Sequence, residues 1–286
     1  MSTKQKGIVF TVIATVIFGI TPAIGKLSYA LGNNGIQLSF LRHLIVLPLF
    51  FLIVVYRKES FRLTKQQTFD VVKVGLGSAL TIVTLYSSYS FIGVGSATVL
   101  HFLYPLFVVL LNFFFYHQKL NMKQMICLVI AIVGVFCFVD PSFDSMIGFF
   151  LAVISGIFFA YYMVGMDHST IRQLSPYVFN FYLVLLNVVF IFILALLTNS
   201  FHAMPIEGYL LSGVVAIFTS LIGVVLLQKG IYCLGASLTA ILSTLEPMTS
   251  VVVGILFLNE TMTFLKVIGC ILVLISTFIL VKNQNA

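Results

Sequence analysis

The longest stretch without charge is the feature that most constrains this chain. Residues 74–118 contain no Asp, Glu, Lys or Arg, and a helix needs only about 20 apolar residues to cross a bilayer. This stretch is too long for a single crossing. Gly93-Val94-Gly95 is the natural place for a turn within it, because glycine accepts the backbone angles of a tight reversal. Charged residues make up 8% of the chain, against about 25% in a soluble domain. This composition excludes a water-soluble globule and predicts a membrane protein.

The same length criterion divides the chain into ten apolar segments. We expect an all-α membrane protein whose helices cross at residues 7–27, 36–56, 70–92, 96–116, 122–140, 147–167, 176–198, 208–230, 236–258 and 263–282. The four cysteines (Cys127, Cys137, Cys233 and Cys270) lie in or beside these segments and form no CxxC pair. They are typical of small buried apolar residues, and we expect no metal and no cofactor.

Basic residues predict the orientation. With both termini inside, the inside segments hold twelve Lys and Arg residues, whereas the outside ends hold only Lys26 and Lys266. An excess of Lys and Arg in short loops marks the cytoplasmic side. We therefore expect a multi-pass protein of the cell (cytoplasmic) membrane with both termini in the cytoplasm. This bias also explains the net charge of +7, and because the basic residues form no face interleaved with aromatics, we expect no nucleic-acid partner.

The two halves of the chain resemble each other at an offset of about 141 residues. Ser39-Phe40 corresponds to Asn180-Phe181, and Tyr104-Pro105 corresponds to Glu246-Pro247. Single matches between apolar helices arise by chance, but these keep their order over five helices. We expect two five-helix repeats, at residues 1–144 and 145–286. Because five is odd, the second repeat enters the membrane from the opposite side, and such inverted repeats are typical of transporters with a site near the midplane.

With these features the chain resembles the drug/metabolite transporter superfamily, EamA type. The resemblance covers essentially the whole chain and rests on the two five-helix repeats, on the prolines of the fourth and ninth helices, and on the Leu-Asn-Glu-Thr turn at Leu258 to Thr261. Gln118 departs from the pattern, since such proteins often have Glu there. The resemblance implies transport of amino acids, nucleotide-sugar-like solutes, choline-like cations or drugs. It also implies a cavity lined by helices one to four and six to nine.

Two ionisable residues lie deep inside apolar segments. Glu246 is near the midplane of the ninth segment and precedes Pro247, which frees the carbonyl four residues back and predicts a helix break. Arg42 lies in the second segment, roughly 5–8 Å away along the membrane normal by helical rise. Charges at this depth usually face a cavity, a partner or a solute. The alternatives are that Glu246 only locks its helix to a neighbour and that Arg42 reaches the outer headgroups.

Further polar groups accompany this pair. His101, Tyr104 and Pro105 share one helix face at spacings of three and four, and Tyr104 is the repeat equivalent of Glu246. A second set consists of Tyr86 and Tyr89 on one face of the third segment, and of Thr21 and Pro22, where we expect the first helix to break. These residues are candidates for binding or coupling, with Pro22, Pro105 and Pro247 as the helix breaks. Ordinary helix packing is the alternative for each.

These features favour a secondary carrier over an enzyme, because the sequence contains no HExxH motif and no paired Asp. We expect alternating-access movement of a small metabolite, an amino-acid-like solute being favoured, with its carboxylate on Arg42 and its ammonium on Glu246. Proton-coupled export is one mode, with the proton as coupling ion. Uptake of a choline-like cation and a non-transporting structural or sensory role stay open, as does a homodimer. The lipid bilayer is an expected partner.

Overall fold

The computed structural model describes residues 1–92, 94–119, 121–137, 145–258 and 263–285. Within these ranges the secondary structure is helical throughout, without a strand. The helices are α1 (Thr3–Tyr29), α2 (Gly35–Tyr56), α3 (Lys65–Ser88), α4 (Val94–His101), α5 (Tyr104–Tyr116), α6 (Met122–Phe136), α7 (Met146–His168), η1 (Thr170–Gln173), α8 (Pro176–Leu197), α9 (Ile206–Val215), η2 (Ala216–Gly223), α10 (Val224–Leu234), α11 (Ala236–Leu242), α12 (Leu245–Leu258) and α13 (Phe264–Asn285).

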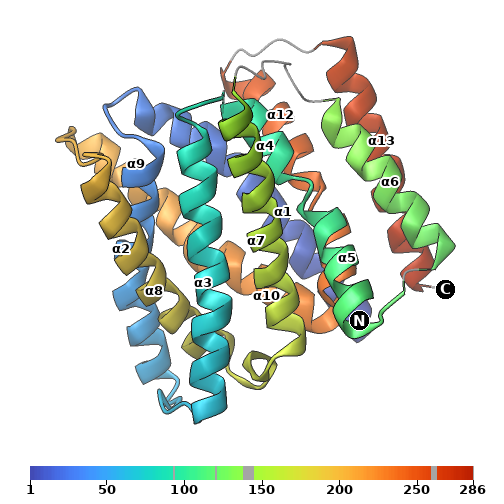
Figure 1. Cartoon of the computed structure of the whole chain (residues 1–286), viewed down its shortest axis with the longest axis horizontal. Coiled ribbons are helices and arrows are strands. Elements are labelled where there is room, and N and C mark those ends of the chain that lie inside the picture. The colour runs from blue at the N-terminus through green and yellow to red at the C-terminus, as the bar shows by residue number, and fades with distance from the viewer. Residues whose placement is uncertain (93, 120, 138–144, 259–262, 286) are drawn as a thin grey trace.

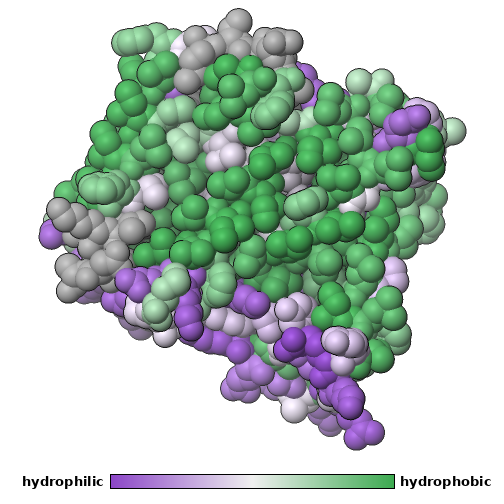
Figure 2. Space-filling view, turned by 180° about the vertical axis from the view of Figure 1, so that it is seen from behind, coloured by the Kyte–Doolittle hydropathy of each residue, from purple (hydrophilic) through white to green (hydrophobic). Residues whose placement is uncertain are grey.

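Eight helical segments of the described chain are long and apolar enough to cross a membrane, and two shorter apolar helices, Met122–Phe136 and Phe264–Ile279, accompany them. The start of α1 and the end of α13 lie at the same end of the bundle (Figure 1). We call this end the terminal end and the opposite end the distal end. Figure 2 shows a broad hydrophobic surface with hydrophilic residues gathered towards the terminal end. This surface is that of a multi-pass membrane protein.

Polar caps fix the helices that begin at the terminal end. Ser2, Thr64 and Asn121 each accept a hydrogen bond from the backbone N–H three residues on, and a glutamine at that position bonds back to the cap. Such a capping box satisfies two backbone donors that a helix start leaves free. These capping residues stand at the ends of apolar runs and therefore set where α1, α3 and α6 begin.

Long-range packing divides the helices into groups. α3 packs along α7, and α7 in turn packs on α4 and α5, whereas α1 packs along α9, η2 and α10 and also on α12. α2 lies against α8. α6 packs against α13, and Figure 1 shows this pair along one flank of the bundle. Two groups of helices thus meet around the centre, with α6 and α13 outside them.

Two membrane segments are interrupted near their middle. α4 ends at His101 and α5 begins at Tyr104, with Pro105 in its first turn. In the second half α11 ends at Leu242 and α12 begins at Leu245, just before Pro247. The carbonyl of Ser243, which Pro247 cannot satisfy, accepts a hydrogen bond of 3.0 Å from the backbone N–H of Glu246. A tighter turn therefore replaces the missing helical bond.

The expected break at Pro22 does not occur, because α1 continues from Thr3 to Tyr29 with Pro22 inside it. Pro22 is exposed, and proline within a membrane helix is tolerated where neighbouring groups satisfy the backbone carbonyl that it frees. The sequence also did not predict η2, a π-helix within the segment that runs from α9 to α10.

Candidate functional site

Glu246 occupies the first turn of α12, at the interruption of its membrane segment. Its side chain lies deep in the bundle and keeps some accessible surface, and we call the region around it the central space. α1 lies directly on this turn at Gly19, where a Cβ would come within 2.7 Å of the Glu246 carbonyl oxygen and 2.5 Å of Thr249 Cβ. Only glycine permits this approach, so α1 and the interrupted helix together position the carboxylate.

Arg42 on α2 faces the same space. Its guanidinium acts electrostatically on Glu246 and on the phenols of Tyr29 and Tyr89, although the described residues contain no ion pair between Arg42 and Glu246 within 4.0 Å. The Arg42 Nε is buried and has no hydrogen-bond partner among those residues. A buried donor without an acceptor is unfavourable by about 1–3 kcal/mol. This donor is therefore available to an incoming acceptor.

His43 turns away from this space. Its Nδ1 lies 2.7 Å from the carbonyl oxygen of Ser39, and its Nε2 lies 3.4 Å from Asn187 Nδ2 on α8. The Asn187 side chain also donates to Ser78 Oγ at 3.1 Å. Successive residues of a helix point about 100° apart. Arg42 therefore lies towards the central space, while His43 lies in the contact between α2 and α8.

Three tyrosines lie towards the distal end of the space. The rings of Tyr86 and Tyr89 meet edge to face with centroids 5.4 Å apart. A Cβ on Gly35 would lie 3.0 Å from the Tyr86 ring and 3.3 Å from the Tyr29 hydroxyl, so both tyrosines contact the start of α2. Tyr29 was missed, because a tyrosine at the end of a predicted crossing is typical of the headgroup zone. No signal in the sequence showed that its hydroxyl lies beside the start of α2.

The first-repeat candidates His101 and Tyr104 lie side by side, with ring centroids 5.6 Å apart. The His101 Nδ1 is 2.9 Å from Ser155 Oγ on α7, and Gly156 lets the His101 carbonyl approach the same helix. Tyr104 is only 2% exposed, and its phenol interacts with Ser243 and Glu246. The structure therefore brings Tyr104 to Glu246, while His101 binds the first-repeat interruption to α7.

Thr21 is joined to the π-helix. Its hydroxyl lies 2.6 Å from the Thr219 hydroxyl in η2. A π-turn within a longer helical segment is often found at a functional site. Thr21 is thus adjacent to the centre through η2 and does not form a hydrogen bond with Arg42 or Glu246 in the described chain.

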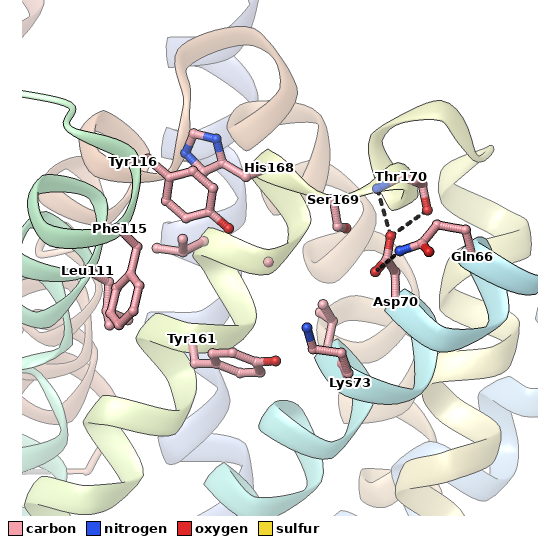
Figure 3. Close-up of a pocket in the computed structure, with 13 residues that line it drawn as sticks. Gln66, Asp70, Lys73, Leu111, Phe115, Tyr116, Tyr161, His168, Ser169 and Thr170 are labelled. Carbon is pink, nitrogen blue, oxygen red and sulfur yellow. Dashed lines mark hydrogen bonds between the residues drawn. The ribbon is translucent and has the colours of Figure 1, made fainter.

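A separate groove of about 520 Å³ lies at the terminal end between α3, α5 and α7 (Figure 3). Asp70 forms one side of it and is held by three donors: Gln66 Nε2 at 3.1 Å, and the backbone N–H and hydroxyl of Thr170 at 3.1 and 2.6 Å. Leu111 and Phe115 form the opposite side (Figure 3). This groove is distinct from the central space around Arg42 and Glu246.

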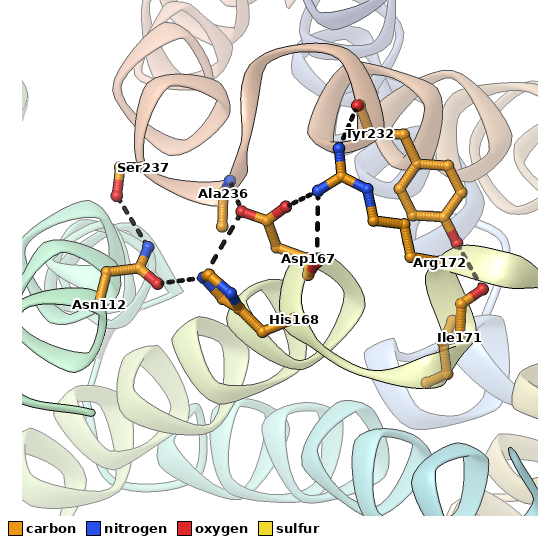
Figure 4. A network of polar contacts seen from close by, with 8 residues as sticks. All are labelled: Asn112, Asp167, His168, Ile171, Arg172, Tyr232, Ala236 and Ser237. Carbon is orange, nitrogen blue, oxygen red and sulfur yellow. Dashed lines mark hydrogen bonds and ion pairs between the residues drawn. The ribbon is translucent and has the colours of Figure 1, made fainter. Parts of the chain in front are cut away.

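A polar network closes the terminal end of the bundle (Figure 4). Asp167 is 6% exposed and pairs with Arg172 Nη1 at 2.7 Å, while its other oxygen accepts from the backbone N–H of Ala236 at 2.7 Å. Arg172 Nη2 donates to the Tyr232 carbonyl at 2.8 Å, and the Tyr232 hydroxyl donates to the Ile171 carbonyl at 3.1 Å. These bonds join the end of α7 and η1 to α10 and α11.

Neutral side chains extend the same network. His168 Nε2 lies 2.9 Å from Asn112 Oδ1, and Asn112 Nδ2 donates to Ser237 Oγ at 2.8 Å. Asn180 Nδ2 donates to Gln228 Oε1 at 2.7 Å. We call all of these contacts the terminal network. From the sequence Arg172 was expected only as an inside charge, and Asp167 was missed, although a carboxylate near the end of an apolar segment was a usable signal.

The distal end is joined differently. Asn34 Nδ2 donates to the Ser200 carbonyl at 2.7 Å, and the Gln37 side chain exchanges two hydrogen bonds with the backbone of His202, at 2.8 and 2.9 Å. Asn33 Nδ2 donates to Ser28 Oγ at 2.8 Å and to Ser212 Oγ at 3.2 Å.

In the described ranges no group of three or more His, Cys, Asp and Glu residues could hold a metal ion.

Comparison with known proteins agrees with this architecture. The sequence model of the EamA-like transporter family matches residues 5–139 and again residues 146–282. The uncharacterized transporter YcbK of Bacillus subtilis (strain 168) is 25% identical over 92% of this chain and 89% of its own length. The uncharacterized transporter sll1319 of Synechocystis sp. is 27% identical over 70% of this chain, and the matched part spans 63% of that protein. One crystal structure superposes with a TM-score of 0.84 over 98% of this chain and 99% of the other, and its 14% identity makes this a likeness of fold alone.

Proposed function

Because the chain belongs to the EamA-like transporter family, we propose that it moves a small amino-acid-like solute across the cytoplasmic membrane by alternating access. The observation that carries this proposal is the central pair: Arg42 and Glu246 have opposite charges and interact electrostatically within the bundle, without an ion pair within 4.0 Å in the described chain. Two such groups can bind the two ends of a zwitterion. The bidentate geometry of a guanidinium suits a carboxylate, and the Glu246 carboxylate suits an ammonium.

The buried, unpartnered Nε of Arg42 supports the assignment of the carboxylate end. An acceptor on the solute would satisfy this donor, whereas a solute without an acceptor would leave it unpaired. Tyr104 beside Glu246 offers a hydroxyl to the same region. Glu246 is then the residue that takes up and releases the coupling proton and that binds the ammonium group of the solute. Export is the favoured direction.

The packing pattern supports inverted repeats with boundaries near residues 144 and 145. The contact of α3 with α7 corresponds to that of α1 with α9, η2 and α10, and the contact of α1 with α12 corresponds to that of α7 with α4 and α5. The contact of α2 with α8 and that of α6 with α13 each join equivalent helices of the two repeats. Exchange of the repeats therefore leaves both contacts unchanged. A pseudo-twofold axis relating the repeats would give this pattern, and we propose that it lies in the membrane plane, with ten crossings and both termini in the cytoplasm.

The two ends of the bundle suggest which conformation the structure represents. The terminal network connects α7, with η1, to α10 and α11, which belong to the other group of helices. The equivalent distal contact would join the end of α1 to the end of α3, where the rings of Tyr86 and Tyr89 meet near the Tyr29 hydroxyl. We therefore assign the structure to a state closed towards the cytoplasm, in which separation of the tyrosines opens the central space to the outside.

The test is ligand binding by the purified full-length protein, measured as thermal stabilisation over a panel of amino acids and of choline-like cations. A ligand that binds only the folded state raises its stability by mass action. We expect an amino acid to stabilise the wild type and Arg42→Ala to lose at least tenfold in affinity, since a charged hydrogen bond contributes about 1.5–3 kcal/mol. Arg57→Ala removes an exposed cation paired with Glu59 and should bind normally.

Coupling is tested in liposomes with Glu246→Gln, which we expect to fold and to lose flux driven by a proton gradient. Unchanged flux with an unchanged pH dependence would remove Glu246 from the mechanism. If Arg42→Ala binds as tightly as the wild type, the zwitterion is wrong. A choline-like cation then becomes the better solute, since the tyrosines around the space favour one by cation–π contact. Absence of uptake for every solute, with Glu246→Leu fully stable, would favour a structural or sensory role.

A further inference from the structure

The groove at the terminal end has two chemically different parts. Leu111, Phe115 and Val164 give it an apolar side, and Gln66, Lys73 and Ser169 give it a polar side. Phe115 is 72% exposed and Tyr161 is 37% exposed, on the apolar outer surface of a bundle that lies in a membrane. The groove is therefore open sideways to lipid, between α3 and α5, near the level where the helices leave the bilayer.

The two charged residues of this groove, Asp70 and Lys73, differ in their contacts. The oxygens of Asp70 are engaged by Gln66 and Thr170, and Asp70 is 8% exposed. Lys73 follows Asp70 by three residues, yet no carboxylate of the described chain lies within 4.0 Å of its Nζ. Its ammonium is exposed and lies 5.1 Å from the centre of the Phe69 ring. The cation thus keeps its hydrogen-bonding capacity at the polar side of the groove.

We propose that the groove binds an anionic phospholipid, with the phosphate on Lys73 and an acyl chain along Leu111 and Phe115. A molecule with a negative head and an apolar tail matches both sides of the groove, whereas a soluble anion would leave the apolar side in contact with lipid. Basic pockets between membrane helices on the cytoplasmic side bind anionic lipid headgroups, and each Lys near that surface contributes about 1 kcal/mol. This inference does not depend on the solute assigned to Arg42 and Glu246.

A lipid in this position would also contact the terminal network. His168 lines the groove, stacks on Tyr116 at a centroid distance of 3.7 Å, and bonds to Asn112 in the network. The lipid would lie between α3 and α5 against α7, with the network intact. Binding should therefore stabilise the state that is closed at the terminal end.

The test uses full-length protein, stripped of lipid in detergent and mixed with phosphatidylglycerol or phosphatidylcholine, with retained lipid measured by native mass spectrometry and stability by thermal unfolding. We expect the wild type to retain phosphatidylglycerol preferentially and to be stabilised by it. Lys73→Gln should reduce this retention about fivefold, the effect of one Lys at an anionic surface. Lys73→Arg should keep it. Lys65→Gln is the matched control, because Lys65 begins the same helix and does not line the groove.

Three results would overturn the proposal. One is equal retention of phosphatidylglycerol by the wild type and by Lys73→Gln. Another is equal stabilisation by phosphatidylcholine and phosphatidylglycerol, which would indicate ordinary lipid contact. The third is full stabilisation by inorganic phosphate alone, which would make the ligand a soluble anion. Because Lys73 is exposed, its substitution should leave folding intact, and thermal unfolding without lipid checks this.

Discussion

The terminal and distal ends of the bundle are closed by different chemistry. At the terminal end a carboxylate that is 6% exposed meets a guanidinium and a backbone N–H, and the bonds join two groups of helices. At the distal end the side chains of Asn34 and Gln37 bond to loop carbonyls, and three tyrosines approach one another. An ion pair with a buried carboxylate thus joins the helices at one end, while the hydrogen bonds named at the other end come from neutral side chains.

This difference determines how easily each end can separate. When tyrosine rings and amides exchange protein contacts for contacts with water, the free energy changes little, because a hydrogen bond contributes only about 0.5–1.5 kcal/mol to stability. Separation of a buried carboxylate from its partner is harder unless water reaches both charges at once. We infer that the distal end opens first and that the terminal end needs a bound solute or a proton to favour its opening.

The largest effect is expected when Asp167 is removed. Asp167→Ala leaves the Ala236 N–H without an acceptor and Arg172 without its partner, and should lower the free energy of unfolding by about 2–4 kcal/mol. We keep below the upper end of the range for buried pairs because the Arg172 side chain is 48% exposed. Chemical unfolding in detergent measures the loss.

Glu59→Ala is the control, since it breaks an ion pair of the same length, 2.7 Å, at the same end of the molecule, whose carboxylate side chain is 20% exposed against 4% for Asp167. Exposed pairs contribute little, so this variant should unfold like the wild type. Equal behaviour of Asp167→Ala and Glu59→Ala would show that the terminal network is not a structural joint.

A medium effect is expected from closely packed glycines. A Cβ on Gly165, near the terminal end of α7, would lie 2.5 Å from Val74 Cγ2, whereas a Cβ on Gly25, near the distal end of α1, would lie no closer than 3.5 Å to Leu38. Gly165→Ala should lower the unfolding free energy by about 1–3 kcal/mol through overpacking. Gly25→Ala should be neutral or should stabilise by up to about 1 kcal/mol, since alanine favours a helix. Thermal unfolding of both variants compares the packing of the two ends. A larger loss of stability in Gly25→Ala than in Gly165→Ala would contradict this prediction.

The smallest effect is expected at the distal amides. Gln37→Ala removes the two hydrogen bonds to the His202 backbone and should lower stability by about 1–2 kcal/mol. Gln67→Ala, which removes only a capping-box glutamine of α3, should lower it by roughly 0.5 kcal/mol. If Gln37→Ala destabilises the protein more than Asp167→Ala does, the distal end is the stronger joint and the order of opening is wrong.

The sequence predicted the helical segments well because their lengths follow from the thickness of the bilayer. In the described chain a helix overlaps each of the ten expected segments, and the interruptions beside Pro105 and Pro247 follow from prolines in the middle of apolar runs. Pro22 looked equivalent, but α1 continues through it from Thr3 to Tyr29. Proline removes one backbone hydrogen bond, and a single sequence does not show whether the surrounding helix stays continuous.

Less of the candidate site could be predicted from the sequence. Arg42 and Glu246 became candidates because charge is rare in an apolar segment, and Tyr104 became one through its place in the repeat. The terminal network was missed because it joins residues 60 and 69 positions apart, as in the bonds from Arg172 to Tyr232 and from Ala236 to Asp167. Such pairings depend on how the helices cross, and periodicity within one helix carries no information about them.

The π-helix η2 also accounts for a small inequality between the halves of the chain. The offset between corresponding residues is 141 at Ser39 and Asn180 and 142 at Tyr104 and Glu246, so the second half contains one residue more between these points. η2 lies in that interval, and its wide i→i+5 turns take up an extra residue. In an α-helix one added residue would rotate everything beyond it by about 100°. η2 thus absorbs an insertion, and α10 still presents Gln228 to Asn180.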